Sequence, residues 1–183
     1  MKAAIFFERD GVLNLTRTQG NTQVIPTTME QFQINPEAVT ALGELKQAGF
    51  LLIATTNQPG ISRGCLSRRE LDWMHAALRR KLPLDDIFVC SHDDGDRCTC
   101  RKPGSGLFIE AAFKWHLDLE RSFVVSDKWQ DAHAARQVGA TSLLLKSPWN
   151  GRGHYDFMAE SLGDIVQKIH QLSSASCLLM HQV

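Results

Sequence analysis

Short, wholly apolar runs alternate along this chain with segments of helical periodicity. A strand that is apolar on both faces must be covered on both sides, and the crossover helices of a parallel sheet provide that cover. The pattern therefore predicts an α/β fold, with a central parallel sheet and helices on both faces. The predicted strands are Ala3–Phe7, Phe50–Thr55, Ile87–Cys90, Ser122–Ser126 and Thr141–Leu145. The predicted helices are Pro36–Ala48, 67–81, Gly106–His116, Trp129–Val138 and Glu160–Leu172.

The predicted helices have recognisable ends. Ser67 is placed as an N-cap with Glu70 three residues later, the pattern of a capping box. Trp73 and Trp115 lie on predicted helices, and we expect both to be core residues. Residues 146–159 contain Gly and Pro and are predicted to form a loop.

Size and charge limit the class of protein. A chain of 183 residues is long enough for one domain with its own core. We expect that domain over residues 1–172, followed by a loosely ordered tail at 173–183. The 20 basic residues balance the 20 acidic ones, which argues against a general nucleic-acid or membrane-surface binder. No apolar run approaches the ~18 residues of a membrane span. A cytoplasmic monomer is expected.

Polar side chains follow the predicted strands at the point where each strand ends. In a parallel sheet these ends meet at one edge, where ligands bind. We therefore expect one crevice to collect these side chains: Glu8, Asp10, Thr56, Asn57, Gln58, Arg101, Lys102, Asp127 and Lys128.

Three carboxylates in this set indicate a cation site. Glu8, Asp10 and Asp127 would repel one another, and a divalent cation removes that conflict. Oxygen ligands with room for waters and a phosphate are typical of Mg²⁺. One carboxylate is then available to attack phosphorus while another transfers protons. The alternative for Glu8 and Asp10 is a solvated pair at a strand end.

The remaining strand-end groups suit a phosphate. The hydroxyl of Thr56 and the turn formed with Asn57 and Gln58 offer donors to phosphate oxygens, although "NQPG" is also a favourable turn by itself. Lys102 offers a point charge and Arg101 a planar fork for a second phosphate or an acid. A surface basic pair is the alternative for these two residues.

Three cysteines and one histidine have the spacing C-x-H-x5-C-x-C. Cys90, His92, Cys98 and Cys100 provide a closed tetrahedral set for Zn²⁺, with no open position for chemistry. The predicted zinc site is therefore structural, and it would fix the loop that continues into Arg101. Three unrelated reduced cysteines are the alternative. Cys65 and Cys177 are expected to be ordinary thiols.

Four segments together resemble one phosphatase superfamily: "FFERDGVLN", "TTNQPGISRG", "CSHDDGDRCTCRKP" and "SDKWQDA". With these motifs the chain resembles the haloacid-dehalogenase-like (HAD) phosphatases over roughly Ala3 to Ile169. It is most similar to the branch that contains D-glycero-D-manno-heptose 1,7-bisphosphate phosphatase and histidinol-phosphate phosphatase. The resemblance implies a Rossmann-like sheet with little or no cap domain, a structural zinc loop and catalytic Mg²⁺.

The resemblance also implies roles for individual residues. The first acid of the opening motif, here Glu8, is the nucleophile and a magnesium ligand. Asp10 protonates the leaving alcohol, then activates water, and its carbonyl binds magnesium, while Asp127 completes that site. Thr56 and Lys102 would bind the phosphoryl group, and Arg101 would contact the distal part of the substrate. Lys128, a candidate substrate-binding residue, and Asp131 would lie at the pocket edge, and Asp131 would orient a lysine.

Two positions depart from the family pattern. The family has Asp where this chain has Glu8, and the extra methylene moves the carboxylate by roughly 1.3 Å, given carbon–carbon bonds of ~1.5 Å. The family also has Gly before the last acid, where this chain has Ser126. Serine is penalised there only if the position needs a positive φ or a close backbone approach.

Three functions remain open from the sequence. The first is a magnesium-dependent phosphatase of a small sugar phosphate. Asn14, a candidate substrate-binding residue, and "QPGISRG" favour heptose bisphosphate as its substrate, whereas the short zinc-loop spacer favours histidinol phosphate. The second is a silent relative that binds phosphate esters without hydrolysing them, which Glu8 and Ser126 favour. The third, a zinc-knuckle nucleic-acid module, conflicts with the neutral charge and the lack of an aromatic stacking stripe.

Overall fold

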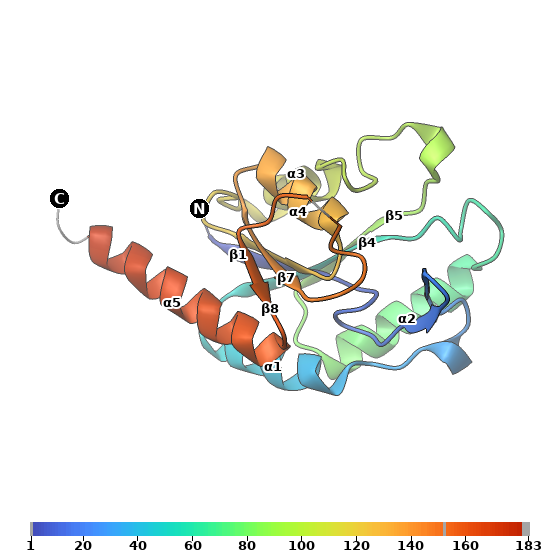
Figure 1. Ribbon diagram of the computed structural model, residues 1–183, viewed down its shortest axis with the longest axis horizontal. Helices are drawn as coiled ribbons and strands as arrows, with labels where there is room; N and C mark the ends of the chain where they lie inside the picture. The colour runs from blue at the N-terminus through green and yellow to red at the C-terminus, as the bar shows by residue number, and fades with distance from the viewer. Residues whose placement is uncertain (1, 152, 181–183) are drawn as a thin grey trace.

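A six-stranded parallel sheet forms the centre of the computed structural model, which describes residues 2–151 and 153–180, with side chains described as far as residue 174 (Figure 1). The strands lie in the order β5-β4-β1-β6-β7-β8. Their bounds are β1 Ala4–Glu8, β4 Leu51–Asn57, β5 Asp86–Cys90, β6 Phe123–Ser126, β7 Thr141–Leu145 and β8 Phe157–Ala159. The predicted α/β class with a parallel sheet is confirmed.

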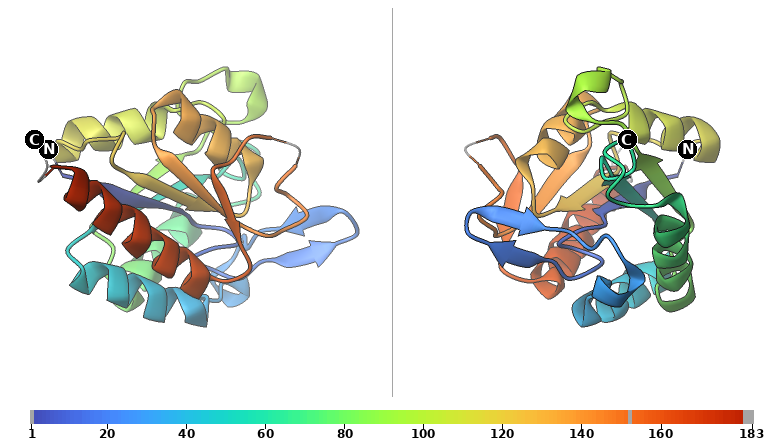
Figure 2. Two further views of the ribbon diagram at one scale, coloured as in Figure 1. Left: turned by 60° about the vertical axis from the view of Figure 1, so that its left-hand side comes forward. Right: turned by 90° about the vertical axis from the view of Figure 1, so that its right-hand side faces the viewer.

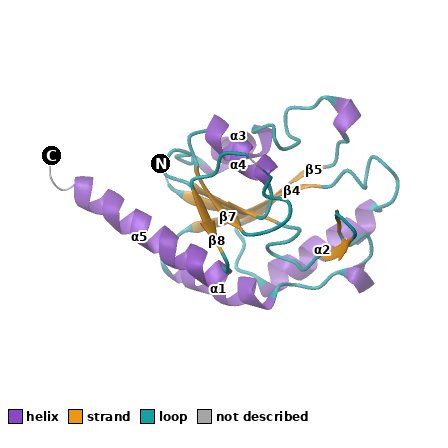
Figure 3. Ribbon diagram, viewed as in Figure 1, coloured by secondary structure: helices purple, strands orange, loops and turns teal. Residues whose placement is uncertain are grey.

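Helices cover both faces of the sheet (Figure 3). On one face lie α1 (Pro36–Gln47), α2 (Arg68–Lys81) and α5 (Leu162–Met180), and on the other lie α3 (Gly106–Trp115) and α4 (Trp129–Gln137). Alternate residues of β1 supply the two cores: Ile5 and Phe7 pack with the first group of helices, and Phe6 packs with the second. Each of these side chains is fully buried, as a two-sided sheet requires.

The five predicted strands and five predicted helices are all present, with ends that differ by a few residues except at the C-terminus. There α5 continues past the predicted end at Leu172 as far as Met180. The tail expected at 173–183 is therefore helical up to Met180, and residues 181–183 lie outside the described part of the chain.

Short elements were not predicted. The hairpin of β2 (Arg17–Gln19) and β3 (Thr22–Val24) and the two 3-10 turns, η1 (Met29–Gln31) and η2 (Asp94–Asp96), have no apolar periodicity to signal them. Strand β8 lies in the segment predicted as a loop, and the prediction was wrong there. This three-residue segment is a strand because it pairs with β7, and its own hydrophobic pattern does not indicate one.

The capping box predicted for α2 is only half formed. The Ser67 hydroxyl accepts a hydrogen bond from the Glu70 backbone N–H at 3.1 Å. The Glu70 carboxylate does not return a bond to the cap; it accepts one from the backbone N–H of Met29 at 2.6 Å. Glu70 therefore ties η1 to the start of α2.

The core prediction for Trp73 was wrong, because 45% of this residue is exposed. The guanidinium of Arg69 stacks on its ring at 4.4 Å, so the indole is covered by a neighbouring side chain on the surface of α2. Trp115 is partly buried against the second core, and its Nε1 donates to Asp86 at 2.9 Å.

Three connections gather at the carboxyl end of the sheet: the β2–β3 hairpin, the loop between β4 and α2, and the loop after β5 (Figure 2, right). No helix in the described residues combines the length and apolar character needed to cross a membrane.

Candidate active site and metal centre

The Glu8 carboxylate lies at the end of β1 inside a ring of donors. Its Oε1 accepts hydrogen bonds from the backbone N–H groups of Arg9 at 3.0 Å and Asp10 at 3.3 Å, and from the Thr56 hydroxyl at 3.1 Å. Its Oε2 pairs with the ammonium of Lys102. Consecutive backbone N–H groups of this kind form an anion-binding nest. Glu8 is 3% exposed, so these donors define a buried anion site.

Lys102 brings its charge to this site from the loop after β5. Its Nζ also donates to Asp131 at 2.5 Å and to the Thr55 carbonyl at 3.0 Å. Burial lowers the pKa of Lys102, but the carboxylates of Asp131 and Glu8 outweigh that effect and raise it. Lys102 is therefore a fixed cation, and the predicted contact between Asp131 and a lysine is confirmed.

Asp10 is held as a carboxylate by three neighbours. Arg9 donates to both of its oxygens at 2.9–3.2 Å, Asn14 donates at 3.1 Å and Gln58 at 2.6 Å. Burial raises the pKa of Asp10, but Arg9 and Lys128 more than compensate and the net pKa is lowered. Asp10 therefore rests in its ionised form.

Gln58 and Asn57 have structural contacts in the site. The Gln58 amide donates to Thr56 Oγ1 at 2.8 Å as well as to Asp10. It therefore bridges Thr56, a predicted phosphate-binding residue, and the Asp10 carboxylate. The Asn57 side chain donates to the Lys102 carbonyl at 2.9 Å and accepts from the Lys102 N–H at 3.1 Å. Both residues thus position other groups of the predicted set.

A second cluster beside the anion site attracts a cation. The ammonium of Lys128 lies 2.5 Å from the Asp10 carbonyl oxygen and 2.7 Å from Asp127 Oδ1. Burial raises the pKa of Asp127, and the negative charge of Glu8 raises it further. The ammonium of Lys128 lowers this pKa, but the net pKa remains raised. The carboxylates of Glu8 and Asp127 and the Asp10 carbonyl are hard oxygen donors of the kind that Mg²⁺ selects. The chemistry of this donor set fits the predicted cation.

Gly11 makes the close approach of Asp127 possible. Its φ is +95°, and a Cβ at this position would lie 2.2 Å from Asp127 Oδ2. The turn after β1 therefore requires glycine for two reasons, backbone conformation and space.

Ser126 carries no backbone strain. Among the described non-glycine residues, only Arg97 and His116 have a positive φ. The Ser126 hydroxyl accepts a hydrogen bond from the Lys128 N–H at 3.1 Å. The serine in place of the family's glycine is thus compatible with the site.

Two contributors were missed by the sequence analysis. Arg9 is 0% exposed and neutralises Asp10. Its position between two buried carboxylates in "ERDG" is the signal that could have identified it. Gln23, on β3, donates to Asp127 Oδ2 at 2.9 Å, and nothing in the sequence signalled this contact because the hairpin itself has no apolar pattern.

The predicted zinc ligands come together in one loop. The Sγ atoms of Cys90, Cys98 and Cys100 and Nδ1 of His92 all lie within 4.8 Å of one another. The S–S separations are 3.5 Å and 3.7 Å. A tetrahedral site with Zn–S bonds of about 2.3 Å has S–S edges of roughly 3.8 Å, so the four side chains fit Zn²⁺.

The remaining cysteines lie apart from this cluster. Cys65 is exposed, and the side chain of Cys177 lies outside the described part of the structure.

Comparison with known proteins supports the same family and fold. A family model described as HAD-hydrolase-like matches residues 99–169. The D-glycero-beta-D-manno-heptose-1,7-bisphosphate 7-phosphatase of Pasteurella multocida (strain Pm70) is 33% identical over 190 residues, covering 95% of this chain and 100% of that protein. The same-named protein of Escherichia coli O6:H1 is also 33% identical, over 91% of this chain and 93% of that protein.

A solved structure is similar over almost the whole chain. The D,D-heptose 1,7-bisphosphate phosphatase from B. bronchiseptica, in complex with magnesium and phosphate, superposes with a TM-score of 0.79 at 29% identity. The match covers 93% of this chain and 99% of that one.

Proposed function

Because this chain belongs to the HAD-like hydrolase family, in the group of the D-glycero-beta-D-manno-heptose-1,7-bisphosphate 7-phosphatases, we propose that it is a magnesium-dependent phosphatase of a small sugar phosphate. The proposed substrate is D-glycero-D-manno-heptose 1,7-bisphosphate, as the names of these relatives suggest. The observation that carries the proposal is the buried anion site around Glu8 beside a set of hard oxygen donors.

The proposed reaction has two steps. A carboxylate oxygen of Glu8 attacks phosphorus, the bond to the sugar oxygen breaks, and Asp10 gives its proton to the leaving alkoxide. Asp10 then removes a proton from water, which attacks the acyl phosphate and releases phosphate and free Glu8. The ionised resting state of Asp10 suits the second step. The first step needs the protonated form, which the negative charge of a bound phosphoryl group favours by raising the pKa of a nearby carboxyl.

The other residues of the site hold charge and position. Thr56 and Lys102 are proposed to bind the phosphoryl oxygens, and Asp131 to orient Lys102. A magnesium ion held by Glu8, Asp127 and the Asp10 carbonyl would neutralise charge on the phosphoryl group. Lys128 already contacts two of those oxygens, so its ammonium has to move towards the pocket edge when the ion binds.

The four ligands Cys90, His92, Cys98 and Cys100 are proposed to hold a structural Zn²⁺. Reduced thiolates as metal ligands are typical of a reducing compartment, which supports the proposal of a cytoplasmic protein. Neither proposal depends on the substrate, for which histidinol phosphate is the alternative.

One observation favours a second function, the binding of phosphate esters without hydrolysis. The Glu8 carboxylate itself accepts hydrogen bonds from the Arg9 and Asp10 N–H groups and from the Thr56 hydroxyl. It also pairs with the Lys102 ammonium. These are donors that phosphoryl oxygens would use. A misplacement of about 1 Å in a reacting group costs roughly a hundredfold in rate, so the longer side chain bears directly on turnover.

Phosphate release in the presence of Mg²⁺ tests the proposal. The unmodified protein, Glu8→Asp and Glu8→Gln are assayed with heptose bisphosphate, histidinol phosphate and an aryl phosphate. We expect turnover of heptose bisphosphate by the unmodified protein, a rate roughly a hundredfold higher in Glu8→Asp, and none in Glu8→Gln.

Asp10→Asn serves as the second control, and it should also abolish turnover. Activity in Glu8→Asp alone would show an intact scaffold whose natural form is silent, and would establish the second function in place of the first.

A further inference from the structure

The β4–α2 loop and the loop that carries the zinc ligands are joined into one unit. Besides the two hydrogen bonds between Asn57 and Lys102, the Gln58 N–H donates to the Cys90 carbonyl at 2.7 Å. Arg63 lies on the first of these joined loops and Arg101 on the second.

Arg63 and Arg101 share one carboxylate. Arg101 Nε donates to Asp94 Oδ1 at 2.7 Å, and Arg63 Nη2 lies 3.6 Å from Asp94 Oδ2. Arg63 is also held by Asp93 through two hydrogen bonds, at 2.7 Å and 2.5 Å. The two guanidinium groups thus converge on Asp94 from different loops.

The Asp94 carboxylate can be displaced from the two guanidinium groups by another anion. Its side chain is 75% exposed, whereas those of Arg101 and Arg63 are 18% and 50% exposed. Exposed ion pairs contribute little to stability because water and salt compete with them. A dianionic phosphate offers guanidinium groups more charge and a better matched set of acceptors than a single carboxylate does.

This arrangement lies next to the proposed reaction centre. Arg101 directly precedes Lys102, whose ammonium contacts Glu8. A ligand with its phosphoryl group at Glu8 would have to extend past Lys102 towards Arg101 to place a second group between the two guanidiniums.

We propose that Arg63 is a specificity residue, which together with Arg101 binds the second anionic group of a bisphosphorylated substrate by displacing Asp94. The proposal rests on the proposed function and deepens it, since it states why a substrate with two phosphates would be selected. Asp94 then acts as an internal competitor, and its removal should improve binding of such a substrate.

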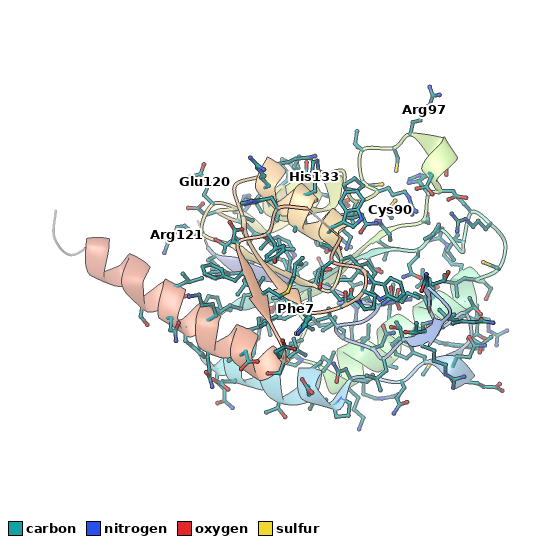
Figure 4. The ribbon with its side chains drawn as sticks, in the orientation of Figure 1. Phe7, Cys90, Arg97, Glu120, Arg121 and His133 are labelled. Carbon is teal, nitrogen blue, oxygen red and sulfur yellow. The ribbon has the colours of Figure 1, made fainter. Side chains whose placement is uncertain are left out.

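Three single variants test this on one loop system. Arg63→Gln removes a proposed ligand, Asp94→Asn removes the competitor, and Arg97→Gln is the matched control. Arg97 is at the tip of the same loop, where its side chain points away from the molecule (Figure 4). The measured quantity is the ratio of KM for heptose 1,7-bisphosphate to KM for an aryl phosphate.

We expect this ratio to rise roughly tenfold in Arg63→Gln, because a hydrogen bond to a charged group is lost. The ratio should fall severalfold in Asp94→Asn. It should stay the same in Arg97→Gln. A merely structural role for Arg63 and Asp94 would shift the ratio in the same direction in both variants. That result, or no shift in Arg63→Gln, would overturn the proposal. Zinc content is measured for each variant to confirm that the loop is intact.

The proposal can also be tested if the protein hydrolyses neither substrate. Isothermal titration calorimetry with heptose 1,7-bisphosphate and Mg²⁺ then replaces KM by Kd. An affinity that depends on Arg63 and rises in Asp94→Asn would uphold this proposal while the proposed phosphatase function fails. An affinity independent of Arg63 would refute it.

Discussion

At the scale of single residues, Arg9 and Asp10 form one of the deeply buried ion pairs of this site. Neither side chain is more than 3% exposed, and their N–O distance is 2.9 Å. Removing one partner of such a pair leaves an uncompensated buried charge, which costs more than the pair itself contributes. The pair therefore holds the Asp10 carboxylate in place. Breaking it would destabilise the folded state.

Replacing Arg9 by methionine should lower the free energy of unfolding by about 3 kcal/mol. The double variant Arg9→Met/Asp10→Asn should recover a large part of that loss, because the unpaired charge is gone. Urea unfolding monitored by circular dichroism measures both. Equal stability of the two variants would show that the Arg9 side chain matters for packing and not for charge.

At the scale of elements, the loop after β5 connects the proposed zinc site to the proposed reaction centre. His92 and Cys100 are predicted zinc ligands, and Arg101 follows at once with a hydrogen bond from its Nη1 to the His92 carbonyl at 3.3 Å. The ligands therefore set the position of Arg101 and, through it, of Lys102. The loop has little apolar burial of its own, so we expect a bound metal to order it.

Replacing Cys98 by serine should remove zinc and lower both the melting temperature and kcat/KM. The physical reason is that three ligands no longer close the tetrahedron and the loop loses its anchor. Metal analysis and thermal unfolding measure the two effects. Cys65→Ser, at an exposed thiol on the neighbouring loop, is the control and should retain zinc. Unchanged stability in zinc-free Cys98→Ser would contradict a structural role.

At the scale of the whole molecule, the sheet assembles the proposed cation site from distant parts of the sequence. Glu8 ends β1, and Asp127 follows β6, the strand paired with it. Asp127 also receives a hydrogen bond from Gln23 of the hairpin. The unfolded chain has no comparable cluster, so a cation that binds here binds the folded state alone.

Magnesium should therefore raise the melting temperature. By linkage, a ligand at a hundred times its Kd stabilises the folded state by about 2.7 kcal/mol, which for a chain of this size raises the melting temperature by roughly 5 to 10 °C. Differential scanning calorimetry with and without Mg²⁺ measures the shift. Asp127→Asn should abolish it, and an equal shift in that variant would mean that the ion binds elsewhere.

The sequence by itself determined the longer strands and helices and the convergence of the site. Runs that are apolar on both faces require a parallel sheet, and parallel strands end at one edge, so the meeting of Glu8, Thr56, Lys102 and Asp127 followed without coordinates. The predicted zinc cluster was equally accessible, because its ligands lie within one short loop where spacing nearly fixes geometry.

Only the tertiary structure decided which of these side chains hold one another. Asn14 and Gln58 were predicted as substrate-binding residues, and the structure adds that both donate to the Asp10 carboxylate. The hairpin that brings Gln23 to Asp127 is polar and exposed, so no hydrophobic pattern marks it. Such contacts join residues far apart in the chain, and their partners are set by packing of the whole fold, which local periodicity and spacing do not encode.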